Sequence, residues 1–338
     1  MTFTQMASQQ TKKADPTKHV NFTQGMILGV DEFVQEFTYL SNRDQWMNRD
    51  LMGYGTVSGL SVNAPVKKNK DNIDETWVEV SAGYAVSPRG LMIRVPRPQC
   101  ANLNEWLAKQ DENTLNKKLE NSPPGMLPVY VTLSYADCLT DDVPIPGEPC
   151  RSEEELEAPS RLKDGFVLEL SLDPPAQCEE DALRKYVQWL ADSIHLTADA
   201  SAPDVESFRR AIRDAVHIAS PPCPALEFGI SSPPTNFTIN VGELSTYLRA
   251  AFLLWVTEFR PYWKIEPNEP GPGCGETASA SQASEETVPN KVLLARLEVP
   301  MTGNEPGGEV TINEDNRPYL LHLRMLQEWM LCREGKQD

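Results

Sequence analysis

A change of hydrophobic period near residue 53 limits what this chain can fold into. From Asp31 to Met52, apolar residues recur at helical spacing, so that Phe33, Phe37, Leu40, Met47 and Leu51 share one face. From Gly53 onward, apolar and polar residues alternate, as in half-buried antiparallel strands. Glycines mark the turns between these short strands. We therefore expect a helix followed by a small antiparallel sheet.

Polar residues lie close to the apolar face of the expected helix: Glu36, Arg43, Asn48 and Arg49. Two interpretations stay open for them. They form a hydrogen-bonded network that fixes the helix on the sheet, because buried polar groups must be paired. Alternatively, they make polar contacts to a neighbouring subunit. Gly53 and Gly55, where the helix ends, are expected to fix the turn into the first strand.

The middle of the chain adds further strands and a proline-rich segment. Val129–Tyr135 and Phe166–Leu172 have strand character. Between them, Asp137–Cys150 is expected to be a rigid loop held by Pro144, Pro146 and Gly147.

Helical patterns dominate the following region. Leu183–Ile194 and Val205–Ala219 predict an inserted α-hairpin. Glu243–Tyr262, which includes Trp255, is apolar on both sides, and this is typical of a helix buried in a domain or between subunits. A strand over Val292–Val299 and a helix over Pro318–Cys332 are expected to close the fold.

The predicted fold class is α+β: short antiparallel strands in sandwich- or barrel-like sheets, several packed helices and the inserted α-hairpin. The expected divisions follow composition and pattern. They are a disordered tail (1–20), a helix-plus-β docking module (21–100), a linker helix and β domain (101–175), a helical region (176–265), a flexible linker (266–290), a strand–helix closing segment that packs on the β domain (291–334) and a disordered end (335–338).

Charge and hydropathy exclude some classes of function. The net charge of −18 argues against nucleic-acid binding, which depends on a basic footprint. No apolar run approaches the ~20 residues of a membrane helix, so no membrane insertion is expected. The polar N-terminus lacks the apolar segment of a secretory signal, which predicts synthesis and assembly in the cytoplasm.

The sequence offers weak candidates for chemistry. The four histidines lie apart from any nucleophile motif, and structural roles are expected for them. Cys138, Cys150, Cys178 and Cys223 could bind zinc, although they form no Cys-x-x-Cys pair. A Cys138–Cys150 disulfide and free packed thiols are the other interpretations. No catalytic residue and no cofactor other than this possible zinc are expected.

Three blocks of residues together form a long pattern that extends over most of the chain. The first comprises Phe22, Gly25, Asp31-Glu32-Phe33, Asn48-Arg49, Leu51, Gly53, Gly55, Val57, Gly59-Leu60, Val62, Gly83, Ala85 and Gly90. The second comprises Tyr135, Cys138, Thr140-Asp141, Val143-Pro144, Pro146–Glu154, Ser160-Arg161, Phe166 and Leu168-Glu169-Leu170. The third comprises Leu293–Leu297 and Arg317–Leu321.

The three blocks resemble a protein of phage-tail-like contractile injection systems, extracellular or membrane-anchored. This resemblance implies a structural, baseplate-associated subunit present in multiple copies. Its expected partners are other baseplate, spike or sheath subunits, which it would hold in the loaded state. The final location, released or anchored to a membrane, stays open. Two alternatives also stay open: a receptor- or glycan-binding part of the same particle, and a hydrolase, either wall-degrading or cysteine-dependent.

Overall fold

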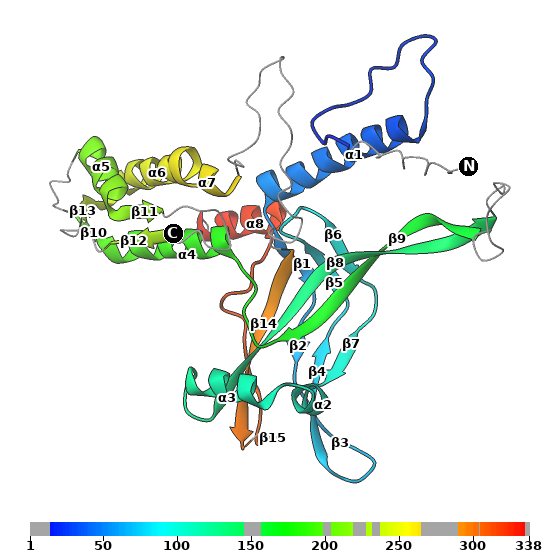
Figure 1. Cartoon of the computed structure of the whole chain (residues 1–338). Helices are drawn as coiled ribbons and strands as arrows, with labels where there is room; N and C mark the ends of the chain where they lie inside the picture. Colours follow the sequence, from blue (N-terminus) through cyan, green and yellow to red (C-terminus); the bar gives the residue numbers. More distant parts are fainter. Residues whose placement is uncertain are drawn as a thin grey trace, which may run out of the picture. The chain divides into compact units, whose positions relative to one another are not determined.

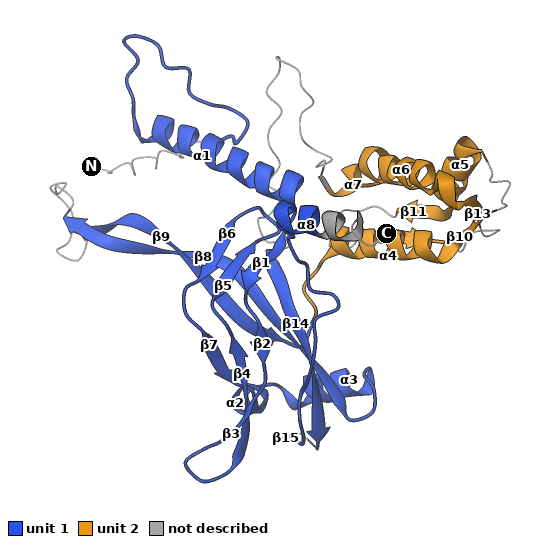
Figure 2. Ribbon diagram, turned by 180° about the vertical axis from the view of Figure 1, so that it is seen from behind, with its two compact units in different colours: residues 1–173, 290–338 blue, residues 174–289 orange. Residues whose placement is uncertain are grey.

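The computed structural model describes residues 14–144, 157–198, 204–218, 228–231, 237–264, 290–303 and 305–334. The chain forms two compact units (Figure 2): unit 1 combines 1–173 with 290–338, and unit 2 is 174–289. The predicted α+β class is confirmed, with helices beside several small antiparallel sheets. The expected modules 21–100 and 291–334 lie in unit 1, as does the module 101–175 except for its last two residues.

Unit 1 is built on antiparallel sheets (Figure 1). One joins β15 (Glu305–Pro306), β14 (Lys291–Thr302), β8 (Met126–Pro144) and β9 (Glu157–Ser171), and β16 (Thr311–Asn313) also pairs with β14. A second joins β1 (Gly55–Gly59), β5 (Gly83–Val86) and β6 (Met92–Val95). A third joins β2 (Val62–Asn63), β4 (Asp74–Val80) and β3 (Val66–Lys68), with β7 (Gln99–Asn102) on β4.

An apolar core joins these three sheets. Leu60 follows β1, Ile93 lies in β6, Leu127 in β8, and Leu294 and Leu297 in β14, and all five are fully buried in it. The core also receives α2 (Leu103–Ala108) and α3 (Glu112–Glu120) through Leu103, Leu107 and Leu115. The predicted linker helix is two helices, and the first begins at Asn102, whose side chain accepts a hydrogen bond from the Glu105 amide. A second cap at Asp111 starts α3 separately.

The first helix forms as predicted. It is α1 (Val30–Trp46), and it continues as a π-helical turn, η1 (Met47–Met52). Asn48 links it to the sheet, because its Nδ2 donates to the Gly90 carbonyl in the β5–β6 turn at 2.9 Å. The helix backbone also lies against this turn, where a Cβ on Gly90 would fall 2.1 Å from the Gln45 carbonyl oxygen. The expected fixing of helix to sheet is thus made at the C-terminal end of the helix.

The closing segment contradicts the sequence prediction. Residues 318–321, predicted to begin a helix, are not helical, and α8 starts later (Leu323–Glu334). Thr56 of β1 donates its amide to the Pro318 carbonyl at 2.9 Å and accepts from the Leu320 amide at 2.9 Å. Gly55 makes this pairing possible, because a Cβ there would lie 2.5 Å from the Pro318 oxygen. Long-range backbone pairing therefore overrides the helical pattern.

Arg317 fixes this closing segment from inside the protein. Its side chain is 2% exposed, and Nη1 pairs with Glu314 at 2.7 Å. Nε donates to the Thr56 hydroxyl at 3.0 Å, and Nη2 donates to the Leu60 carbonyl at 2.9 Å. The guanidinium also lies over the Tyr319 ring, 5.0 Å from its centroid. One cation thus satisfies acceptors on two segments that are far apart in the sequence.

Unit 2 has a separate core. Its helical elements are α4 (Cys178–Ser193), α5 (Val205–Ala215), η3 (Val241–Glu243), α6 (Leu244–Leu254), η4 (Trp255–Phe259) and α7 (Pro261–Lys264). The strands β10 (Ile194–Thr197) and β13 (Phe237–Asn240) pair in parallel, and β11 (Val216–Ile218) and β12 (Phe228–Ile230) pair antiparallel. The helices α4 and α5 correspond to the predicted α-hairpin. Trp255 is buried in this core, stacked on Tyr186 with 5.4 Å between ring centroids.

Replacing Arg317 should destabilise unit 1 strongly. In Arg317→Met, the Leu60 carbonyl and the Thr56 hydroxyl lose their buried donor, so we expect a loss of about 3 kcal/mol in the free energy of unfolding. Chemical denaturation followed by circular dichroism measures it. The matched control is Arg324→Met, which breaks the exposed Arg324–Glu328 pair and should lose about 0.5 kcal/mol. Equal losses in the two variants would contradict the role assigned to Arg317.

The contact between Gly90 and Gln45 can be separated from backbone strain. Gly90 and Gly303 both have positive φ, +85° and +66°, but a Cβ on Gly303 would meet nothing within 4 Å. Alanine at either site should lose about 1 kcal/mol through the left-handed backbone. We expect Gly90→Ala to lose about 2 kcal/mol more, because the helix must shift. Thermal unfolding compares the two, and similar melting temperatures would argue against close packing at Gly90.

Candidate interaction surface

The apolar stripe of α1 and η1 faces outward. We call Val30, Phe33, Phe37, Leu40, Met47 and Leu51 the α1 stripe, and all six side chains are exposed. Phe33 and Phe37 are 64% and 71% exposed. No residue of α1 is buried within the described part of the chain. An amphipathic helix normally turns such a stripe toward the core, so the stripe is a candidate contact surface for another molecule.

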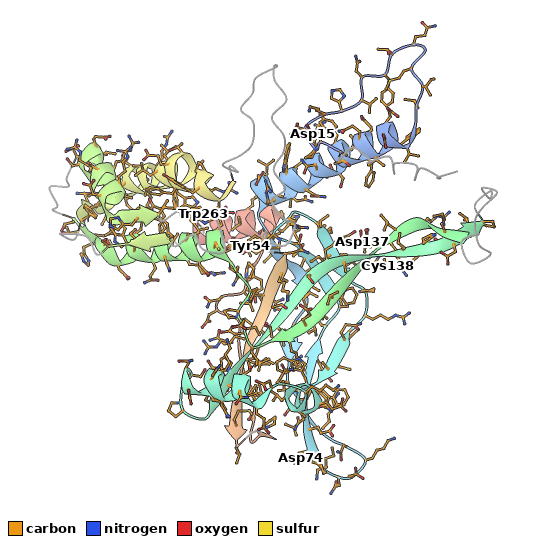
Figure 3. The ribbon with its side chains drawn as sticks, viewed as in Figure 1. Asp15, Tyr54, Asp74, Asp137, Cys138 and Trp263 are labelled. Atoms are coloured by element: carbon orange, nitrogen blue, oxygen red, sulfur yellow. The ribbon has the colours of Figure 1, made fainter. Side chains whose placement is uncertain are left out.

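A segment before the helix explains this orientation. Residues 14–20, predicted to belong to the disordered tail, lie against the polar side of α1, with Asp15 beside the helix (Figure 3). The Asp15 amide donates to Gln35 Oε1 at 3.0 Å, and the Val20 amide donates to Glu36 Oε2 at 2.9 Å. His19 stacks near Tyr39, with 5.1 Å between ring centroids. The chain covers the polar side of its own helix and leaves the apolar side open.

The charged carboxylate of Asp15 stabilises the turn at the start of this segment. Hydrogen bonds from Lys18 and Thr17 lower the pKa of Asp15 to about 2, so its carboxylate stays charged in mildly acidic solution. Because this pKa lies below the usual value, the charged carboxylate contributes to the stability of the fold above pH ~4. This contribution is lost as the pH falls through about 2. Because Lys18 and Thr17 belong to the same segment, the charged carboxylate stabilises the local turn of residues 15–18 at physiological pH.

The four predicted polar residues have different roles. Asn48 fixes the helix to the sheet, as described above. Glu36 holds the preceding segment. The Arg43 guanidinium lies over the Tyr39 ring at 5.6 Å from its centroid, and Arg49 forms an ion pair with the adjacent Asp50 at 2.9 Å. The sequence thus pointed to Asn48 as a residue that fixes the helix on the sheet, but it did not predict that the α1 stripe is exposed.

The second exposed feature is a two-stranded ribbon, which we call the β8–β9 arm. The strand β14 pairs with β8 only as far as Ser134, and beyond it the described part of β8 pairs with β9 alone, through Glu157. Figure 3 labels Asp137 and Cys138 on this ribbon. Leu139 and Leu162 are direct partners across it, and both are exposed. The arm therefore presents an apolar pair and free backbone edges.

The arm corrects the predicted proline loop. Residues 137–144 are strand, not loop, because they pair with 157–164, and Pro144 ends β8 opposite Glu157. Pro146, Gly147 and Cys150 lie outside the described residues. At the base of the arm, the Tyr135 hydroxyl donates to Asp164 Oδ1 at 2.6 Å. Burial and this hydrogen bond raise the pKa of Tyr135 to about 12, so the phenol remains a donor at neutral pH.

Two of the four predicted metal candidates, Cys138 and Cys178, lie in the part of the chain that the structure describes. Cys138 is a free, exposed thiol on the arm. Cys178 is disulfide-bonded, so the expectation of a free thiol or a zinc ligand is wrong for this residue in this state. Cys223, like Cys150, lies outside the described residues. Among the residues that the structure describes, no group of three or more His, Cys, Asp or Glu side chains is placed to hold a metal ion.

Two comparisons with known proteins were made for the whole chain, and neither assigns it to a family. Neither a scan against models of protein families nor a search of curated proteins finds a match to this chain. Within the described ranges, each helix is too short or too polar to cross a bilayer. Function is therefore inferred from the residues themselves, and above all from the α1 stripe and the arm.

The α1 stripe should be dispensable for folding. In Phe33→Ser/Phe37→Ser, two exposed rings are removed, and serine and phenylalanine have similar helix propensities. We expect the free energy of unfolding to change by less than about 0.5 kcal/mol. Binding of a hydrophobic dye should fall, because the exposed apolar surface is smaller. Buried Leu107→Ala is the control and should lose about 3 kcal/mol. A comparable loss in the double variant would mean that the stripe packs within the chain.

Proposed function

We propose that this chain is a structural subunit of a contractile, phage-tail-like injection particle. In this role it packs in or around the baseplate and holds neighbouring subunits in the loaded state. The observation that carries the proposal is the outward-facing α1 stripe, fixed to a sheet scaffold through Asn48 and Gly90. An exposed apolar stripe on a fixed helix supports docking, because burial in an interface removes it from water.

The β8–β9 arm supports the same role. Its backbone edges and its exposed apolar pair allow contact with a neighbouring subunit by strand pairing or side-chain packing. The residue blocks that resemble baseplate-associated proteins include both the start of the helix, at Asp31–Phe33, and the arm, at Tyr135–Pro144. A subunit with two separate docking features can link two neighbours, as a particle with several copies requires.

Trp255 gives no support to the glycan-binding alternative. A sugar-binding platform needs an exposed aromatic face, whereas Trp255 is buried between Tyr186, Phe228 and Trp263. Its role is to fill the core of unit 2.

Particle assembly tests the proposal. In cells that lack the native copy, we expect the wild-type chain to co-sediment with sheath and baseplate proteins. Phe33→Ser/Phe37→Ser should reduce this co-sedimentation at least about tenfold, the effect of losing about 1.4 kcal/mol of docking free energy. The matched control is Phe252→Ser, which removes an exposed ring from unit 2 and should assemble normally. If the wild-type chain is missing from purified particles, the structural role is wrong.

A further inference from the structure

The α1 stripe has the spacing of a coiled-coil seam. Val30, Phe33, Phe37, Leu40, Asp44 and Met47 follow one another at intervals of three, four, three, four and three residues. A helix with this repeat presents a narrow seam that a second helix fills by packing side chains into its gaps. All six positions are exposed in the structure. The shape of the surface thus fits one helix lying along α1.

Asp44 is the unusual member of this seam. Its side chain is exposed between Leu40 and Met47, and no interaction engages it within the described residues. A helix lying along the stripe would remove this carboxylate from water. Such desolvation is unfavourable unless the partner supplies a charge or hydrogen-bond donor. The adjacent Arg43 lies over the Tyr39 ring on the flank of the stripe.

Pairing between two copies of this chain does not supply that cation. Parallel pairing in register places Asp44 against Asp44. In an antiparallel pair that matches all six positions, Val30 faces Met47 and Phe37 faces Leu40. Asp44 then faces Phe33 of the other copy. The chain also carries a net charge of −18, which opposes self-association.

We propose that the α1 stripe docks an amphipathic helix of a different subunit, whose apolar seam carries a lysine or arginine opposite Asp44. This inference rests on the proposed structural role and specifies the chemistry of one partner. The apolar positions provide affinity, and the charge pair fixes the register and rejects helices without a cation at that layer. Asp44 thus acts as the specificity residue of the surface.

A charge-swap experiment with the full chain tests this. Two peptide probes of about four heptads carry leucine at the seam positions and differ only in one middle layer, which is lysine or glutamate. Fluorescence anisotropy measures their binding to wild-type protein, to Asp44→Lys and to Phe37→Asp. We expect wild type to bind the lysine peptide at least about tenfold more tightly than the glutamate peptide. Asp44→Lys should reverse this order, and Phe37→Asp should bind neither peptide.

The reversal excludes general attraction to an acidic protein. Asp44→Lys changes the net charge only from −18 to −16 (−18 + 2), so non-specific attraction of the lysine peptide would persist. No binding, or a peptide preference that does not follow residue 44, would overturn the proposal. So would self-association of the wild type that Phe37→Asp abolishes in sedimentation velocity. Stripe-dependent binding to phosphatidylcholine–phosphatidylglycerol vesicles would overturn it as well, by assigning the surface to lipid.

Failure of this inference can be told apart from failure of the structural role. If the peptides fail but the wild-type chain is present in purified particles, the structural role stands and the assigned partner chemistry is wrong. If the chain is missing from particles but the charge swap works, α1 binds a helix in some other assembly.

Discussion

The buried guanidinium of Arg317 is the interaction on which unit 1 depends. It joins the closing segment to the end of β1 through the Thr56 hydroxyl and the Leu60 carbonyl. Backbone pairing of Thr56 with Pro318 and Leu320 adds to it. The strand β1 follows η1 directly, so the same interaction anchors the point from which the first helix extends. A buried cation with several acceptors tolerates little displacement, and this gives α1 a fixed base.

The first helix differs from an ordinary amphipathic helix in what covers each side. Residues 14–20 pack against its polar side. The side chains on its apolar side are exposed among the described residues. Asn48 and the close approach at Gly90 then hold its C-terminal end. Exposing this apolar surface is unfavourable in water, and a partner that covers it would recover that free energy on assembly. The proposed docking of a foreign helix follows from this imbalance.

Local patterns predicted much of the fold. The helix over Asp31–Met52 and the strand over Val292–Val299 have local causes, namely the side-chain period and the turn glycines. Predictions failed where backbone pairing with a distant segment replaces the structure that the local pattern favours. Residues 318–320 pair with Thr56 instead of forming a helix, and 137–144 pair with 157–164 instead of forming a loop. Both outcomes depend on contacts that no local window contains.

The sequence alone determined that a helix with one apolar stripe leads into an antiparallel sheet, because hydrophobic period and glycine placement act through the nearest turns. It also predicted that Gly53 and Gly55 fix the turn into the first strand, and both have a positive φ, +88° and +136°. The tertiary structure decided which way the stripe faces. That direction depends on which segments pack on which side of the helix, and here residues 14–20 pack on its polar side. Packing of this kind is a contact between distant segments, so no single segment determines it.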